Sequence, residues 1–217
     1  PESFCEIPEA HCHLGFQARR QEPDGSLLKA CGNRRESVCR PCATVYRADT
    51  WQLVAAGLRG GKGIPESVAE HPMVFATFTA PSFGPMNPKR DGEPLDPASW
   101  NYKQAILWNA SAPELWRRTT IYIKRALASE AGISQRELNR TVRISYTKVA
   151  EYQRRGAIHF HAVIRLDDTD SGTVGRPAAQ FTAEALERAI RTAAIEVRVP
   201  SPSEYIPAIR WGSQLDI

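Results

Sequence analysis

The sequence has no long apolar run and no obvious leader segment. No stretch approaches the roughly 18 consecutive apolar residues that a membrane-spanning helix needs, so we expect no membrane partner. The chain begins with Pro1 and Glu2, without a methionine or a signal peptide, and Gln214–Ile217 at its end has the pattern of a strand. We therefore expect a truncated protein. Its 217 residues allow one large domain and a small additional module.

Cysteine is absent after residue 42, although the chain has five. Without a secretory signal, these residues indicate a reducing compartment, and we expect a cytoplasmic protein. Cys39 and Cys42 have the spacing of a metal-binding knuckle, and Cys31 lies eight residues earlier. The preferred fourth ligand is Cys12, with Cys5, His11 and His13 as alternatives. We predict a structural Zn²⁺ module within residues 1–65; the alternative is a set of ordinary core thiols.

Positive charge is concentrated in one part of the chain. The net charge is +4, but the segment from Arg117 to Arg155 holds ten Lys and Arg residues against three acidic ones. Such a segment suits a polyanion because phosphate neutralisation releases counterions, although a solvated helix face has a similar composition. The predicted DNA contacts are Arg143, Lys148, Arg154, Arg155 and Arg165.

Apolar periodicity predicts a mixture of helices and strands. Helices are expected over 41–58, 111–131 and 182–197, and strands over 74–79, 141–153, 157–166 and 206–211, with another at the end of the chain. Ser111–Glu114 has a capping-box pattern, which sets the predicted start of the second helix. Arg154–Gly156 is typical of a three-residue hairpin loop. We therefore predict an α+β fold with an antiparallel sheet and helices on one face.

Strict alternation over Ile158–Leu166 predicts a strand with one apolar face. His159 and His161 lie on the other face, about 6–7 Å apart at their Cα atoms, so that their rings can share one metal ion. The hairpin loop places Glu151 opposite His159 and puts Gln153 on the same face. These four residues form the predicted divalent-metal site, with positions left open for substrate. The alternative is a pair of ordinary solvent-facing histidines.

The segment Glu151–His161 resembles the second motif of the HUH nucleases, in which two histidines flank a hydrophobic residue. Phe75–Pro81 resembles their first motif, a threonine-bearing strand beside the histidine strand. Cys31–Cys42 and Thr79–Pro85 are similar to segments in the replication initiators of actinobacterial plasmids and integrative conjugative elements. The resemblance implies an HUH nuclease domain over residues 66–217 of a bacterial protein.

The resemblance also implies a rolling-circle replication initiator that binds single-stranded or hairpin origin DNA and nicks one strand. In that family Mg²⁺ or Mn²⁺ polarises the scissile phosphate and a tyrosine attacks it, leaving a 5′-phosphotyrosine link and a free 3′-hydroxyl. Host replication proteins are expected partners.

The third motif of the family, a tyrosine on a helix after the histidines, has no match here. Tyr205 alone follows His161, and its proline neighbours disfavour a helix. We expect the nucleophile beyond Ile217, with Tyr205 as the alternative and then Tyr152 and Tyr146.

Other functions remain open from the sequence. A non-catalytic, zinc-dependent DNA-binding protein would also explain the cysteines and the basic segment. A histidine-triad enzyme would need a third histidine where Val163 stands, and a cupin-like site would require an all-β barrel.

Overall fold

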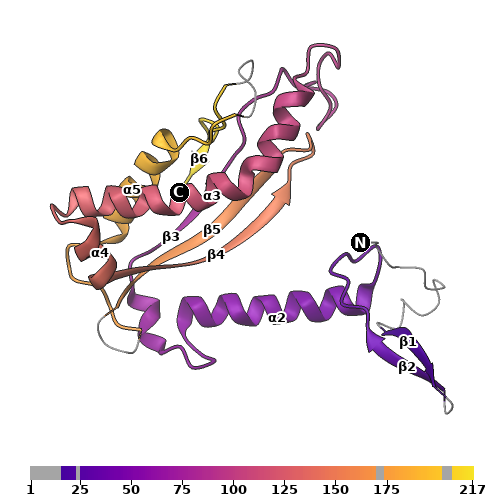
Figure 1. Cartoon of the computed structure of the whole chain (residues 1–217), viewed down its shortest axis with the longest axis horizontal. Coiled ribbons are helices and arrows are strands. Elements are labelled where there is room, and N and C mark those ends of the chain that lie inside the picture. Colours follow the sequence, from indigo (N-terminus) through magenta and orange to yellow (C-terminus); the bar gives the residue numbers. More distant parts are fainter. Residues whose placement is uncertain (1–15, 23–24, 170–173, 202–206) are drawn as a thin grey trace. The chain divides into compact units, whose positions relative to one another are not determined.

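A computed structural model describes residues 16–22, 25–169, 174–201 and 207–217, and for residues 16–22 and 25–30 it describes only the backbone. The chain divides into two compact units, Pro1–Ile64 and Pro65–Ile217. Figure 1 shows the elements of each unit. None of the described helices is long and apolar enough to cross a membrane.

The first unit contains an antiparallel pair, β1 (Phe16–Glu22) and β2 (Gly25–Ala30), and the long helix α2 (Arg40–Arg59). The helix matches the prediction for 41–58: a proline stands in its first turn, and Gly60 ends it with a φ of 89°. The hairpin was not predicted, because residues 1–40 show no clear alternation.

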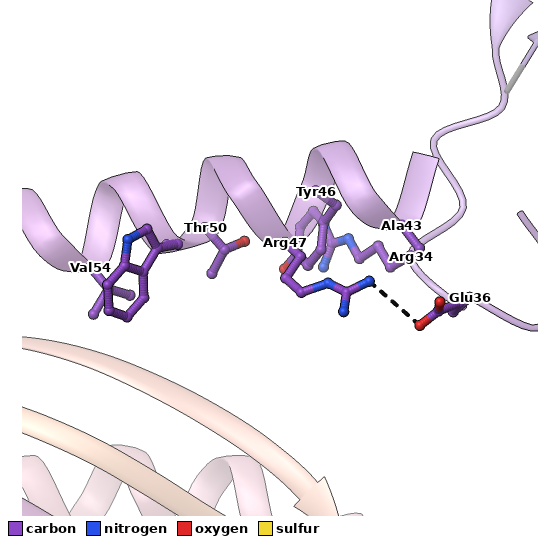
Figure 2. A pocket seen from close by; sticks show the side chains of 8 residues that line it. Arg34, Glu36, Ala43, Tyr46, Arg47, Thr50 and Val54 are labelled. Carbon is purple, nitrogen blue, oxygen red and sulfur yellow. Dashed lines mark hydrogen bonds and ion pairs between the residues drawn. The ribbon is translucent and has the colours of Figure 1, made fainter. Parts of the chain in front are cut away.

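Helix α2 also lines a pocket of about 450 Å³ (Figure 2). The guanidinium of Arg34 lies 4.5 Å from the centre of the Tyr46 ring, and Arg47 pairs with Glu36 at 3.4 Å. Thr50 and Val54 continue the lining along the helix. The two described arginines of this pocket are thus each held by a neighbouring side chain.

The second unit is built on a four-stranded antiparallel sheet in the order β4-β5-β3-β6. The strands are β3 (Met73–Phe78), β4 (Val142–Tyr152), β5 (Ile158–Asp168) and β6 (Leu215–Asp216). The helical elements are η1 (Glu66–Glu70), α3 (Tyr102–Glu130), α4 (Gln135–Thr141) and α5 (Ala183–Glu196). Helices α3 and α5 lie together over one face of the sheet (Figure 1), which confirms the predicted mixed α+β architecture.

The core between sheet and helices is rich in aromatic rings. Phe78 of β3 contacts both Trp116 of α3 and Trp211, with ring centroids 5.5 and 5.0 Å apart. Phe160 of β5 contacts the same two tryptophans at 6.0 and 5.7 Å. Since these phenylalanines alternate with the outward-facing residues of their strands, the core also fixes which side chains face away from the helices.

Helix α3 begins nine residues before the predicted start at Ser111. Asn101 is the actual cap: its side chain accepts a hydrogen bond from the Gln104 amide at 2.9 Å. Pro113 lies inside the helix although it cannot donate a backbone hydrogen bond. Trp108, Ala112, Leu115 and Trp116 have helical spacing and are all buried, so packing maintains the helix through the proline.

The structure differs from the predicted elements in two further places. Helix α4 (Gln135–Thr141) was not predicted; Ser134 caps it by accepting from the Glu137 amide, and Leu138 is buried. The strand predicted over 141–153 follows it directly as β4. In the region predicted as a strand at 206–211, the described part, residues 207–211, makes one isolated bridge, Ile209 with Val199.

A candidate metal centre on the histidine strand

The β4–β5 hairpin sets the geometry of the site. Gly156 has a φ of 78°, and its amide donates to the Gln153 carbonyl at 2.8 Å while the Gln153 amide donates to Ala157. This confirms the predicted three-residue loop with glycine in the left-handed position. The resulting register places Glu151 directly opposite His159.

Three ligand-type side chains converge on the sheet face opposite the helices. Oε2 of Glu151 lies 3.5 Å from Nε2 of His159 and 3.6 Å from Nε2 of His161. Ligand atoms that bind one ion at about 2.1 Å lie at most about 4.2 Å apart, so both distances fit a shared divalent cation. Two imidazoles and one carboxylate also leave coordination positions for substrate oxygens.

Strand β3 holds the imidazole of His161 in place. Thr77 pairs with His161 across the sheet, and its hydroxyl lies 3.0 Å from Nδ1 of that histidine. With a proton on Nδ1, the imidazole donates to the hydroxyl and turns the lone pair of Nε2 toward Glu151. The Phe75 ring stacks on the same imidazole, with centroids 5.8 Å apart and planes 13° apart. Neither contact was predicted from the sequence.

Gln153, the fourth predicted ligand, makes a hydrogen bond with the neighbouring Arg155. Its side-chain oxygen accepts a hydrogen bond from Nε of Arg155 at 2.8 Å. The other nitrogens of Arg155 donate to the carbonyls of Ala80 and Pro81, both at 2.9 Å. Burial lowers the pKa of Arg155. These bonds tie the hairpin loop to the segment after β3, so the half-buried Arg155 has a structural role.

The other predicted DNA contacts differ in how accessible they are. Arg143 is exposed near Asp167, and Arg154 is exposed beside Asp91. Lys148 points toward the helix-covered face, where its ammonium lies 3.8 Å from the centre of the Phe160 ring and burial lowers its pKa. Arg165, the fifth predicted contact, is buried.

Arg165 belongs to a buried polar cluster around Asp167. Nε and Nη2 of Arg165 donate to the Asp167 carboxylate at 2.7 and 3.0 Å, Ser145 donates at 2.5 Å, and Nδ1 of His71 lies 2.8 Å away. Burial alone would raise the pKa of Asp167, but these hydrogen bonds outweigh it and lower the pKa below its ordinary value. Sequence patterns missed the cluster because His71 and Asp167 are 96 residues apart.

Two of the alternative tyrosines lie away from the candidate metal centre. Tyr146 pairs with Ile164 and Tyr152 with Ile158, so both lie on the opposite face of β4 from Glu151. Tyr146 contacts Trp116 of the core. Tyr205 lies outside the described residues.

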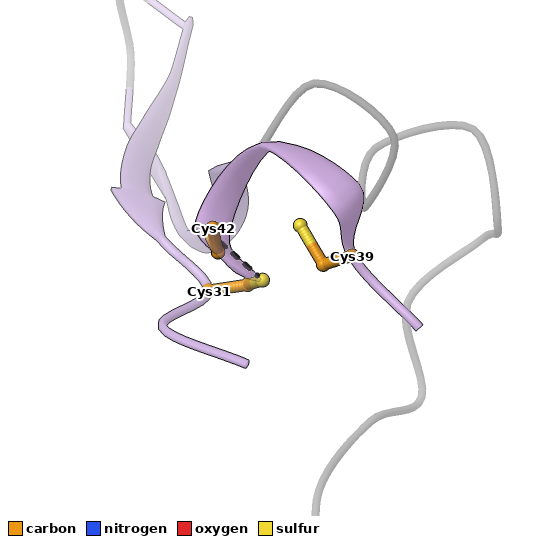
Figure 3. A group of neighbouring side chains, drawn as sticks. All are labelled: Cys31, Cys39 and Cys42. Atoms are coloured by element: carbon orange, nitrogen blue, oxygen red, sulfur yellow. Dashed lines mark hydrogen bonds between the residues drawn. The ribbon is translucent and has the colours of Figure 1, made fainter. Parts of the chain in front are cut away.

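The cysteine cluster lies at the start of α2 in the first unit (Figure 3). The sulfurs of Cys31, Cys39 and Cys42 all lie within 4.8 Å of one another, and those of Cys31 and Cys42 are 3.4 Å apart. Thiolates on a tetrahedral zinc ion lie about 3.7 Å apart, given a Zn–S bond of about 2.3 Å. The three sulfurs thus fit three corners of such a site. The candidate fourth ligands, Cys12, Cys5, His11 and His13, lie outside the described residues.

Comparison with known proteins gives a consistent picture. The family model of the replication initiator protein of pSAM2 (RepSA) matches residues 13–91 and 86–217. A replication initiator protein from Streptomyces ambofaciens is 46% identical over a match of 221 residues. The match covers 90% of this chain and 48% of the relative. The chain thus spans about half the length of that relative. No solved structure matches. The chain belongs to the replication initiator protein family of pSAM2.

Proposed function

We propose that this chain contains the DNA-nicking centre of a rolling-circle replication initiator of the HUH type. The observation that carries the proposal is the convergence of Glu151, His159 and His161 on one point of the sheet face opposite the helices. The family to which the chain belongs, and the printed name of the Streptomyces relative, support a role in starting DNA replication. Origin DNA, single-stranded or hairpin, is then the substrate, and host replication proteins are partners.

The three side chains would hold Mg²⁺ or Mn²⁺, which supplies Lewis-acid polarisation of the scissile phosphate. Glu151 lowers the local positive charge, and Thr77 keeps Nε2 of His161 directed at the site. A tyrosine hydroxyl attacks phosphorus, the bond from phosphorus to O3′ breaks, and the proton lost by tyrosine balances the one gained by the 3′-hydroxyl. The product is a 5′-phosphotyrosine link with a free 3′ end.

Metal binding can be tested without DNA. Mn²⁺ should raise the melting temperature of the wild-type chain, since a ligand of the native state stabilises it. His161→Ala should abolish the rise. Val163→Ala, two residues along the same strand and on the same face, is the matched control and should keep it. An undiminished Mn²⁺ response in His161→Ala would disprove the assigned site.

Cleavage is tested by a denaturing gel with end-labelled single-stranded origin DNA and Mn²⁺. A protein–DNA adduct that disappears in Tyr205→Phe would identify Tyr205 as the nucleophile. An adduct that forms only with the full-length protein would place the nucleophile outside these 217 residues. The absence of any adduct from both proteins would contradict nicking.

The second candidate function is a zinc-dependent DNA-binding protein without catalysis, which the cluster of Cys31, Cys39 and Cys42 favours. It predicts one tightly bound Zn²⁺, salt-sensitive DNA binding and no response to Mn²⁺. The two candidates therefore differ in whether a metal ion binds at the histidine pair.

A further inference from the structure

Two large apolar side chains flank His161 on the face of the sheet that carries the metal centre. Phe75 of β3 is 57% exposed and stacks on the imidazole, and Val149 of β4, directly opposite His161, is 44% exposed. A single exposed apolar residue is ordinary on a protein surface. Two of them beside the same metal-ligand candidate form a local apolar surface that is accessible next to the charged centre.

The chemistry of this surface suits an unpaired nucleobase. Single-stranded DNA is held by aromatic rings on which bases stack and by cationic groups that contact phosphate. The Phe75 ring is nearly parallel to the His161 imidazole, so a base on its exposed side would extend the same stack. Phenylalanine has no hydrogen-bonding group, so this contact would not distinguish one base from another. It would only favour a nucleotide with a base over an abasic one.

The apolar surface lies next to the place where the reaction would occur. His161 contacts the Phe75 ring and is also one of the three residues that would bind the scissile phosphate through a metal ion. A base adjacent to that phosphate is the part of the DNA within reach of Phe75. In duplex DNA the faces of the bases are occupied by their neighbours, so only an unstacked nucleotide can use this contact.

We propose that Phe75, with Val149 beside it, is a stacking platform that holds an unpaired base of single-stranded DNA next to the scissile phosphate. The proposal rests on the proposed function, because it assumes that the metal centre binds a DNA phosphate. It adds a positioning role for side chains outside the ligand set.

The test compares two fluorescent probes that carry the same number of phosphates: oligothymidylate and an abasic oligomer of equal length. Wild type should bind oligothymidylate more tightly than the abasic probe. Phe75→Ala should lose about 5- to 150-fold in affinity for oligothymidylate, the range that base–aromatic stacking contributes, and little for the abasic probe. Phe75→Tyr keeps the ring and should bind both probes as wild type does.

Tyr152→Ala is the matched control, because Tyr152 is 73% exposed but lies on the other face of the sheet. It should leave the preference for bases unchanged. Phe75→Leu keeps apolar bulk against His161 without a ring, so it should retain the Mn²⁺ response and still lose the preference for bases.

Equal preference for oligothymidylate in wild type, Phe75→Leu and Phe75→Ala would overturn the platform. That result, combined with a normal Mn²⁺ response and adduct formation, would leave the proposed function intact. A wild-type protein without Mn²⁺ response and adduct, but with a base preference that depends on Phe75, would refute nicking and keep the stacking role.

Discussion

At the scale of single residues, Thr77 orients the imidazole of His161. Its hydroxyl is the partner of Nδ1 of His161, and such partners fix the orientation of a metal-binding imidazole. Thr77→Val keeps the shape of the side chain and removes this bond. We expect Mn²⁺ affinity, measured by calorimetric titration, to fall about 10-fold. Thr147→Val, on β4 and the same sheet face, should have no effect; equal losses in both variants would contradict the role of Thr77.

Asp167 is the residue on which the buried polar cluster depends. Asp167→Asn leaves Arg165 buried without its counter-charge, so the free energy of unfolding should fall by about 3 kcal/mol. Asp91→Asn removes only an exposed partner of Arg154 and should cost less than about 1 kcal/mol. Chemical denaturation of the two variants measures both. A loss in Asp167→Asn no larger than that in Asp91→Asn would show that the cluster contributes little to stability.

The lowered pKa of Asp167 also gives a pH dependence. In the unfolded chain this carboxyl has its ordinary pKa of about 3.9, above that of the folded state. The stabilisation is therefore fully present above about pH 4 and is lost as pH falls through the folded-state value. Denaturation curves of wild type should show this loss on acidification, and those of Asp167→Asn should lack this part of it. Parallel curves for the two proteins would rule out Asp167 as the titrating group.

At the scale of elements, the β4–β5 hairpin aligns the three side chains of the candidate metal centre. Gly156 has positive φ, and a Cβ added there would meet no atom within 4 Å, so substitution tests the backbone alone. Gly156→Ala should lower the free energy of unfolding by about 1 kcal/mol, and Gly156→Asn by less, because asparagine tolerates this conformation better. Chemical denaturation of the two variants measures both losses in the free energy of unfolding. Equal losses would indicate that another effect than backbone conformation dominates.

Helix α3 shows that local sequence signals can mislead about where a helix starts. Ser111–Glu114 has a good capping pattern, yet the helix begins at Tyr102 and includes Pro113. The cost of a proline inside a helix is overcome by burial of Trp108 and Trp116 against the sheet and Trp211. Asn101 caps the helix locally, and packing partners that lie far away in the sequence keep it continuous through Pro113.

At the scale of the whole molecule, the two units should hold different metals independently. Purified protein should contain about one Zn²⁺, and Cys39→Ser should release it and destabilise the first unit. The Mn²⁺ response of the second unit should remain in this variant, since its ligands lie on β4 and β5. Elemental analysis measures the zinc content, and thermal shifts measure the Mn²⁺ response. Loss of the Mn²⁺ response in Cys39→Ser, or native thiols that titrate rapidly, would contradict this division.

Local sequence patterns were enough to predict the mixed fold, the β4–β5 hairpin and the face shared by Glu151, His159 and His161. These features are local: alternation has a period of two residues, and a three-residue loop fixes which residues stand opposite each other. The cysteine cluster was equally visible because its described members lie within twelve residues of one another.

The neighbours that contact those residues, in contrast, depend on how distant segments pack together. Thr77 and His161 are 84 residues apart, and the partners of Arg155 in the Ala80–Pro81 segment are more than 70 residues away. Arg165 has the same place in the alternation as the two histidines, yet it is buried beside Asp167, whereas they remain partly exposed. Alternation assigns a side chain to a face, but burial of that face depends on segments that the chain brings from a distance.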